Sequence, residues 1–299
     1  MAREGSSSSE DCECGYERPS DELILKQHDQ IREEQASKVN VIGDMEELPI
    51  LTKEYTDKNY FNKIASIKNQ YNTFRRVQSD GNCFYRAFIY GYLEQLISTR
   101  DEIECERMLA CLLSKFDVLC AQGFDSLVFE ETLDALMNYI KRIASFPSSS
   151  FSATPCSNDD ALNADELQLA FRDSSTSFDL MVIMLLRLIT SCEIQSKEDF
   201  FLPFILGMSN SLSCSSFCRS HVEPMNEESD HIHIVALSNS LGVPLRVVYL
   251  DAGDSIVGAA EHDFIPVNWD PESPPRVVLL YRPGHYDILY PSQALVLAE

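Results

Sequence analysis

The sequence changes character once, near Gly242, and this change restricts the fold more than any other feature. Before it, apolar residues recur at helical spacing in five segments: 83–97, 127–143, 178–192, 197–208 and 231–241. After it, β-branched and aromatic residues fill three runs: 243–250, 277–281 and 285–290. The turn Arg282-Pro283-Gly284 joins the last two runs into a predicted hairpin. Helices followed by mainly antiparallel strands predict an α+β domain, with one small sheet flanked by helices.

Two polar stretches suggest how the chain is organised. Residues 1–20 are acidic and Ser-rich, and they have too few apolar groups to offset the entropy lost on ordering, so we expect a disordered tail. A helical arm over 21–70 follows, amphipathic in its first part, and the main domain spans 71–292. Within that domain, the Ser- and Pro-rich residues 145–165 predict a flexible insertion.

The charge and the cysteine content exclude several classes of protein. A formal net charge of −23 disfavours nucleic-acid binding, which requires clustered Lys and Arg. The longest apolar run, 180–189, is too short to cross a membrane and contains Arg187. No secretory signal precedes the first helix, so we expect a cytoplasmic protein, with the nucleus as a second compartment. The ten cysteines are then expected to be thiols, and any special cysteine has to be argued individually.

One cysteine lies at a predicted helix start. Asp80-Gly81-Asn82 is typical of a tight turn, and the helical spacing begins directly after Cys83. Unpaired backbone N–H groups at a helix N-terminus favour a thiolate, and they can also stabilise an oxyanion. A helix terminus contributes only about 0.3–1 kcal/mol, whereas one pKa unit is about 1.4 kcal/mol. A reactive Cys83 therefore needs a distant histidine.

His285 is the strongest of the six histidines as that partner. It begins a predicted strand, and period-2 geometry places Asp287 on the same face, within reach of its ring. Cys83, His285 and Asp287 then form a nucleophile, a base and an orienting acid. Each residue also has an ordinary interpretation: a small core residue, a turn and a solvated edge-strand acid.

Other candidates remain open at this stage. His231 and His233 follow Asp230, which could orient one of them, although they fit a structural role at a helix start. Cys214 and Cys218 lack the paired spacing of a zinc site, so we expect neither a metal nor a cofactor. Tyr85 and Arg86 could contact substrate, but an exposed pair on the first turn of an amphipathic helix is the more common situation.

Three segments resemble one known family. Residues 80–88 read Asp-Gly-Asn-Cys-Phe-Tyr-Arg-Ala-Phe, residues 279–290 read Leu-Leu-Tyr-Arg-Pro-Gly-His-Tyr-Asp-Ile-Leu-Tyr, and residues 222–234 contain Val-Glu-Pro-Met and Asp-His-Ile-His-Ile. All three are similar to the otubains, which are ovarian-tumour-domain deubiquitinases. The similarity extends from about residue 71 to 291, and motifs of nine and twelve residues in the right order are highly specific.

The resemblance implies a papain-like α+β fold and a thiol-dependent ubiquitinyl hydrolase. It implies Cys83 as nucleophile, His285 as general base and Asp287 as the acid that holds it. It further implies that the loop of Asp80 shapes the oxyanion hole. The expected substrate is polyubiquitin, with a preference for lysine-48 linkages, and ubiquitin-conjugating enzymes are expected partners. Two alternatives stay open: a non-catalytic protein that restrains those enzymes, and a cysteine protease with another substrate.

Overall fold

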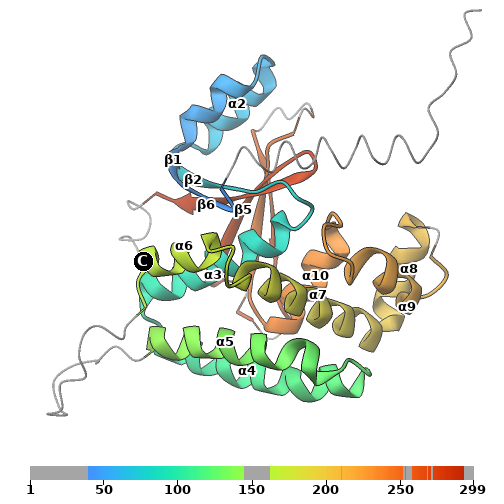
Figure 1. Cartoon of the computed structure of the whole chain (residues 1–299). Helices are drawn as coiled ribbons and strands as arrows, with labels where there is room; N and C mark the ends of the chain where they lie inside the picture. The colour runs from blue at the N-terminus through green and yellow to red at the C-terminus, as the bar shows by residue number, and fades with distance from the viewer. Residues whose placement is uncertain are drawn as a thin grey trace, which may run out of the picture.

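A six-stranded sheet runs through the centre of the protein in the computed structural model (Figure 1). The structure describes residues 40–144, 162–209, 211–251, 253, 258–267, 269–270 and 272–292. The strands are β1 (Ile42–Glu47), β2 (Tyr71–Val77), β3 (Leu245–Tyr249), β4 (Ala260–Phe264), β5 (Val277–Arg282) and β6 (His285–Pro291). Their order is β1-β2-β6-β5-β3-β4, and every pairing is antiparallel except β3 with β5. The predicted α+β class, with a mainly antiparallel sheet and a late hairpin, is confirmed.

Helices cover both faces of this sheet. They are α2 (Lys58–Ile67), α3 (Cys83–Thr99), α4 (Glu102–Ala121), α5 (Ser126–Ala144), α6 (Ala164–Arg172), α7 (Phe178–Ser196), α8 (Glu198–Met208), α9 (Cys214–Phe217) and α10 (His231–Leu241), with a 3-10 helix η1 (Leu48–Glu54) and a π-helical turn η3 (Cys218–Val222). The five helices predicted from periodicity are present. The periodicity did not predict the helices α2, α4, α6, α9, η1 and η3 or the strands β1, β2 and β4.

The two faces of the sheet bury alternate residues, as the period of a strand requires. On β5, Leu279 lies in the larger core with α3 and α7, while Leu280 lies in a smaller core with η1 and α2. On β6, Ile288 and Leu289 divide in the same way. His285 and Asp287 share the face of Leu289, as predicted, so their side chains are on the side of η1.

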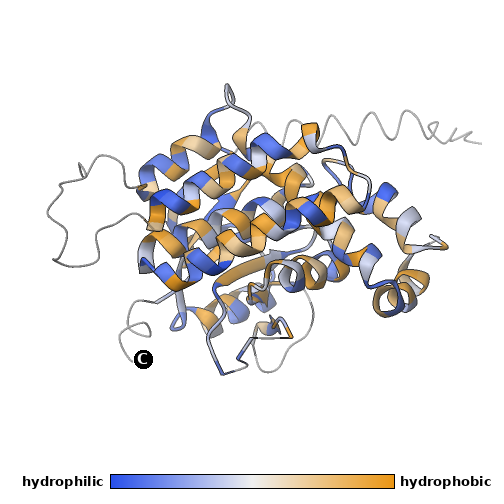
Figure 2. Cartoon of the chain, turned by 90° about the horizontal axis from the view of Figure 1, so that it is seen from below, coloured by the Kyte–Doolittle hydropathy of each residue, from blue (hydrophilic) through white to orange (hydrophobic). Residues whose placement is uncertain are grey.

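The helices of the larger core are amphipathic or fully buried according to their position. On α5, the buried residues recur three or four positions apart, and the opposite face is hydrophilic (Figure 2). By contrast, α7 is buried on nearly all sides, including the guanidinium of Arg187. Among the described residues, none of the helices has the length and apolar character needed to cross a bilayer.

The structure corrects one predicted boundary. Residues 42–70 do not form a separate arm, because β1 pairs with β2 and both η1 and α2 bury apolar side chains against the sheet. The main domain therefore begins near Ile42 and not at residue 71. The predicted tail over 1–20, the first part of the arm and most of the insertion over 145–165 lie outside the described residues.

Candidate active site

The loop between β2 and α3 carries Cys83 to the edge of the sheet. Gly81 has a φ of 84°, and a Cβ at this position would come within 2.0 Å of the carbonyl oxygen of Asn226. Only glycine combines that backbone conformation with such a close approach. The tight turn expected at Asp80-Gly81-Asn82 is therefore present, and it packs directly against the loop that follows η3.

Cys83 is the first residue of α3 and is 5% exposed. Asn82 precedes it but does not cap the helix with its side chain, which instead exchanges hydrogen bonds with Asn226. The first backbone N–H groups of α3 are consequently left without a side-chain cap, next to the sulfur. This is the arrangement that the sequence predicted for an oxyanion site.

His285 and Asp287 form a hydrogen-bonded pair at the start of β6. The hairpin turn holds Gly284 at a φ of 73°, and His285 pairs with Arg282 across it. His285 Nε2 lies 2.8 Å from Asp287 Oδ1, which also accepts the backbone N–H of Val77 at 3.0 Å. Because a carboxylate only accepts, Nε2 carries the proton of this bond.

The remaining nitrogen of the ring is available to the cysteine. His285 Nδ1 is buried and forms no hydrogen bond of ordinary geometry with a described residue. Burial alone would lower the pKa of His285, but Asp287 and the nearby side chain of Cys83 raise it to about 10. Burial would likewise raise the pKa of Asp287, yet His285 and Arg282 hold it below its usual value. Cys83, His285 and Asp287 are therefore brought together.

Arg282 supports this pair, although no pattern in the sequence predicted a role for it. Its Nη2 donates to Asp287 Oδ2 at 2.6 Å, and its Nη1 donates to Glu54 Oε2 at 3.0 Å. Asp287 is 0% exposed, and all its described partners are donors. Arg282 is the first residue of the predicted turn and lies in the 279–290 motif, and these are the signals that could have drawn attention to it.

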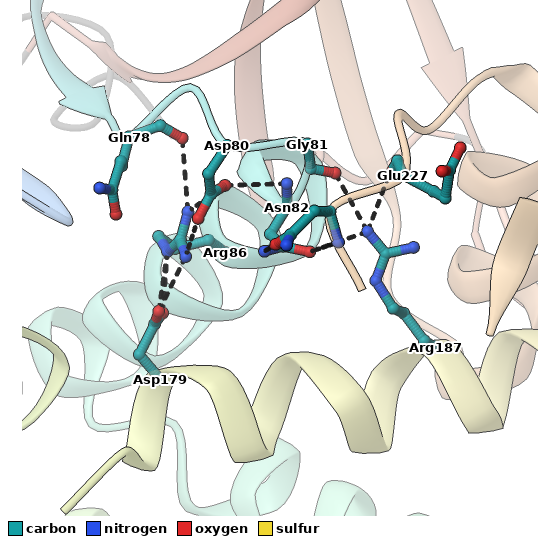
Figure 3. A network of polar contacts seen from close by, with 9 residues as sticks. Gln78, Asp80, Gly81, Asn82, Arg86, Asp179, Arg187 and Glu227 are labelled. Carbon is teal, nitrogen blue, oxygen red and sulfur yellow. Dashed lines mark hydrogen bonds and ion pairs between the residues drawn. The ribbon is translucent and has the colours of Figure 1, made fainter. Parts of the chain in front are cut away.

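Asp80 is held by a buried arginine. Asp80 Oδ1 accepts from the backbone N–H of Asn82 at 2.9 Å, and the two carboxylate oxygens accept from Arg86 Nη1 and Nη2 at 2.9 and 2.8 Å. Arg86 also donates to both oxygens of Asp179 on α7. Figure 3 shows Arg86 between these two carboxylates. Asp80 thus fixes the shape of the loop, because its carboxylate accepts the backbone N–H of Asn82 while Arg86 holds the carboxylate in place.

The interpretation of Tyr85 and Arg86 as an exposed pair is wrong. Both are 0% exposed, because α3 is buried on nearly every side. Their partners come from distant segments: Asp179 for Arg86, and Arg187, whose guanidinium lies 4.7 Å from the Tyr85 ring centre. Sequence spacing gives no signal for such pairs.

The other histidine pair has a structural role. His233 is 1% exposed, and its ring joins Asp230 in capping α10 while Nε2 lies 3.0 Å from the carbonyl oxygen of His221. The ring of His231 lies edge-on to the ring of Phe264, with ring centres 5.2 Å apart. Cys214 and Cys218 are both buried, and the described residues contain no group of three or more metal-ligating side chains.

The arrangement can carry out acyl transfer. A sulfur nucleophile lies beside an imidazole, a buried carboxylate orients that imidazole, and uncapped helix N–H groups lie next to the sulfur. Separate elements supply each part: the start of α3, the start of β6 and the loop before α3.

The sequence is similar to known proteins over most of its length. Residues 34–291 match the family described as peptidase C65 otubain. The Arabidopsis thaliana ovarian tumour domain-containing deubiquitinating enzyme 1 is 38% identical over 278 residues, which cover 90% of this chain and 86% of the relative. Human ubiquitin thioesterase OTUB1 is 37% identical over 272 residues, with 90% of each chain covered.

Solved structures show the same fold. A complex described as h/ceOTUB1 with ubiquitin aldehyde and UBC13~Ub superposes with a TM-score of 0.75 at 25% identity, and it covers 91% of this chain and 98% of that one. The corresponding complex with UBCH5B~Ub gives a TM-score of 0.74 over the same shares.

Proposed function

Because the chain belongs to the otubain family of deubiquitinating cysteine peptidases, we propose that it hydrolyses isopeptide bonds of polyubiquitin with Cys83, His285 and Asp287. The observation that carries this proposal is the buried His285–Asp287 pair, whose free ring nitrogen faces the region of Cys83. Relatives named ubiquitin thioesterases supply the substrate class.

In the first half of the reaction, the Cys83 thiolate attacks the carbonyl carbon at the C-terminus of ubiquitin. The oxygen becomes an oxyanion, which the N–H groups at the start of α3 stabilise. The His285 imidazolium then gives its Nδ1 proton to the departing lysine amine, and a thioester remains. Asp287 keeps the ring in the tautomer and orientation that this transfer requires.

In the second half, water replaces the amine. Neutral His285 removes a proton from the water, which attacks the thioester carbonyl, and collapse of the intermediate releases a carboxylate and the Cys83 thiolate. The proton that His285 gained restores the imidazolium. No cofactor enters this cycle.

The direct test uses ubiquitin with a C-terminal electrophile, incubated with the protein under reducing conditions. We expect one adduct on Cys83 in the wild type and none in Cys83→Ala. Cys120→Ser is the matched control, because Cys120 is an exposed free cysteine and its loss should leave labelling unchanged. Equal labelling of wild type and Cys83→Ala would reject the proposed nucleophile.

We further propose the lysine-48 linkage as the preferred bond, on the resemblance of the 80–88 and 279–290 motifs to otubains. A panel of the eight diubiquitin linkages tests this preference. Fastest cleavage of another linkage would contradict it, while leaving the isopeptidase function intact.

An exposed apolar surface on α8 is the site we propose for docking ubiquitin. Phe200 and Phe204 are 53% and 55% exposed, with ring centres 5.7 Å apart. The opposite side of α8 is anchored by Phe201 in a small core that includes Val222, at the start of the loop that packs on Gly81. Exposed apolar surfaces of this kind mark interaction sites, and this one is connected to the nucleophile loop through Phe201 and Val222.

A second function is supported by the solved complexes, which are described as containing UBC13~Ub and UBCH5B~Ub. We propose that the chain also binds ubiquitin-conjugating enzymes and restrains them without cleavage. Inhibition of a conjugation assay by Cys83→Ala would support this function, because no hydrolysis remains. Removal of residues 1–38 should abolish the inhibition but leave cleavage of a minimal substrate. If inhibition is retained after this deletion, residues 1–38 are not responsible for the restraint.

A further inference from the structure

Arg187 on α7 ties together the two loops that surround Cys83. Its Nη2 donates to the carbonyl oxygen of Gly81 at 3.0 Å, to Asn82 Oδ1 at 2.9 Å and to the carbonyl oxygen of Glu227 at 2.7 Å. Its Nη1 donates to the carbonyl oxygen of Val222 at 3.0 Å. Figure 3 shows the guanidinium of Arg187 reaching from α7 toward the nucleophile loop and toward Glu227.

All of these acceptors are neutral, although the guanidinium is fully buried. Arg187 is 0% exposed and forms no ion pair with a carboxylate in the described part of the chain, and its Nε has no acceptor there. Arg86, which is equally buried, has two carboxylate partners, Asp80 and Asp179. Burial lowers the pKa of Arg187 and outweighs the opposing electrostatic effects of its neighbours, as expected for a cation without a carboxylate in direct contact.

A buried cation without a carboxylate in direct contact is costly, because buried charges are normally paired. The Tyr85 ring, 4.7 Å from the guanidinium, is the π partner of Arg187, and further negative charge near Arg187 can arise in the reaction itself. Two of its acceptors belong to Gly81 and Asn82, the residues directly before Cys83. The side chains that act electrostatically to raise the pKa of Arg187 against burial are, in decreasing order, Tyr85, Glu227, Asp80 and Cys83. A thiolate or an oxyanion at Cys83 would therefore develop its charge within the field of Arg187.

We propose that Arg187 is a positioning residue for the reaction at Cys83, which fixes the 80–83 loop against the 222–227 loop and supplies the positive potential that stabilises the thiolate. The role of Arg187 in cleavage rests on the proposed isopeptidase function. Its effect on the Cys83 thiolate does not depend on that function. Lysine would keep the positive charge but not the positioning role, because a single ammonium group cannot donate in the two directions that Nη1 and Nη2 of the guanidinium serve.

The first measurement is the rate at which iodoacetamide alkylates Cys83 as a function of pH, followed by mass spectrometry of the Cys83 peptide. This rate reports the thiolate without using ubiquitin. In Arg187→Met, we expect the midpoint of the profile to rise by about one pH unit or more. In Arg187→Lys, which keeps the charge, the midpoint should stay close to that of the wild type.

The second measurement is hydrolysis of a fluorogenic amide at the C-terminus of ubiquitin. Both Arg187 variants should lose roughly a hundredfold in kcat with little change in KM, because misplacement of the loop by about 1 Å is enough for such a loss. Arg107→Met is the matched control: Arg107 also donates to a backbone carbonyl, that of Leu241, and pairs with Glu104, but it lies on α4. It should lose stability and keep the wild-type alkylation profile.

An alkylation midpoint in Arg187→Met equal to that of the wild type would overturn the electrostatic role. If Arg187→Met does not fold by circular dichroism, Arg187→Lys decides, and a wild-type kcat in that variant would overturn the positioning role. If the wild-type protein cleaves no ubiquitin substrate, the isopeptidase function is rejected, and the alkylation profiles still test Arg187.

Discussion

Arg282 Nη2 lies 2.6 Å from Asp287 Oδ2, while His285 bonds to the other oxygen, Oδ1. The orienting acid is thus held by a cation as well as by the histidine that it orients. Arg282 also pairs with Glu54 at the end of η1. This pair connects η1 to His285, from which it is far removed in the sequence. This connection explains why residues 48–54 belong to the domain and not to a separate arm.

Replacing Arg282 with methionine should lower kcat about tenfold to a hundredfold and leave KM nearly unchanged, because Asp287 would lose one anchor but keep two. The buried carboxylate loses an ion-pair partner, so the free energy of unfolding should fall by about 3 kcal/mol. Steady-state kinetics and urea denaturation measure both effects. Glu54→Gln is the control, since Arg282 keeps its ion pair with Asp287 in that variant. If Glu54→Gln lost as much kcat as Arg282→Met, the direct contact of Arg282 with Asp287 would not be the cause of the loss.

The pH dependence follows from the pKa of His285, which is raised from 6.5 to about 10 in the folded protein. The imidazolium is needed as the proton donor, so kcat/KM should decline as pH rises toward 10. The raised pKa also stabilises the fold below about pH 6.5, and this stabilisation is lost as pH rises through about 10.

Asp287→Asn separates the cause of this raised pKa from other alkaline effects. Without the carboxylate, His285 loses the larger of the two groups that raise its pKa and keeps only Cys83, so its pKa should fall and the alkaline limb of kcat/KM should move to lower pH. The stabilisation should then be lost at lower pH as well. Rate profiles and melting temperatures between pH 6 and 10 measure both, and an alkaline limb at the same pH in both proteins would disprove the role of Asp287.

Gly81→Ala tests the close packing of the nucleophile loop. An added Cβ would meet the carbonyl oxygen of Asn226 at 2.0 Å, so the loop has to move. We expect kcat to fall at least about a hundredfold and stability to fall by about 2 kcal/mol or more. Gly123→Ala is the matched control, because Gly123 also has a positive φ, of 92°, but nothing lies within 4 Å of the added Cβ. Similar kinetic losses in the two variants would show that backbone strain, and not this contact, is responsible.

Local periodicity predicted the parts of the site that lie close together in the chain. His285 and Asp287 are two residues apart on one strand, so period 2 was sufficient to pair them. The tight turn at Gly81 was also readable, because turn chemistry is local. The link from Cys83 to His285 required either elimination among six histidines or the resemblance to otubains.

The residues that the sequence did not reveal are those whose partners are distant. Arg86 and Asp179 are 93 positions apart, and neither lies in a pattern that distinguishes a buried ion pair from a solvated one. Strand β2 was missed for a related reason: Arg75 and Arg76 interrupt its apolar alternation, and both are satisfied by carboxylates, Glu94 and Glu46, from other elements. Period-based reasoning assumes that charged residues face water, and this fold violates that assumption near the site.

The α8 surface gives the prediction that best distinguishes substrate binding from chemistry. Phe204→Arg should raise KM for a ubiquitin C-terminal amide about tenfold or more and leave kcat within about threefold, since an exposed aromatic anchor contributes to binding before any bond breaks. Cleavage of a short peptide amide with the same C-terminal residues should be unaffected. Leu127→Arg on α5 is the control, because Leu127 is 86% exposed but does not belong to this surface. If Phe204→Arg changes kcat and not KM, α8 acts through the fold of the nucleophile loop, and the docking site for ubiquitin lies elsewhere.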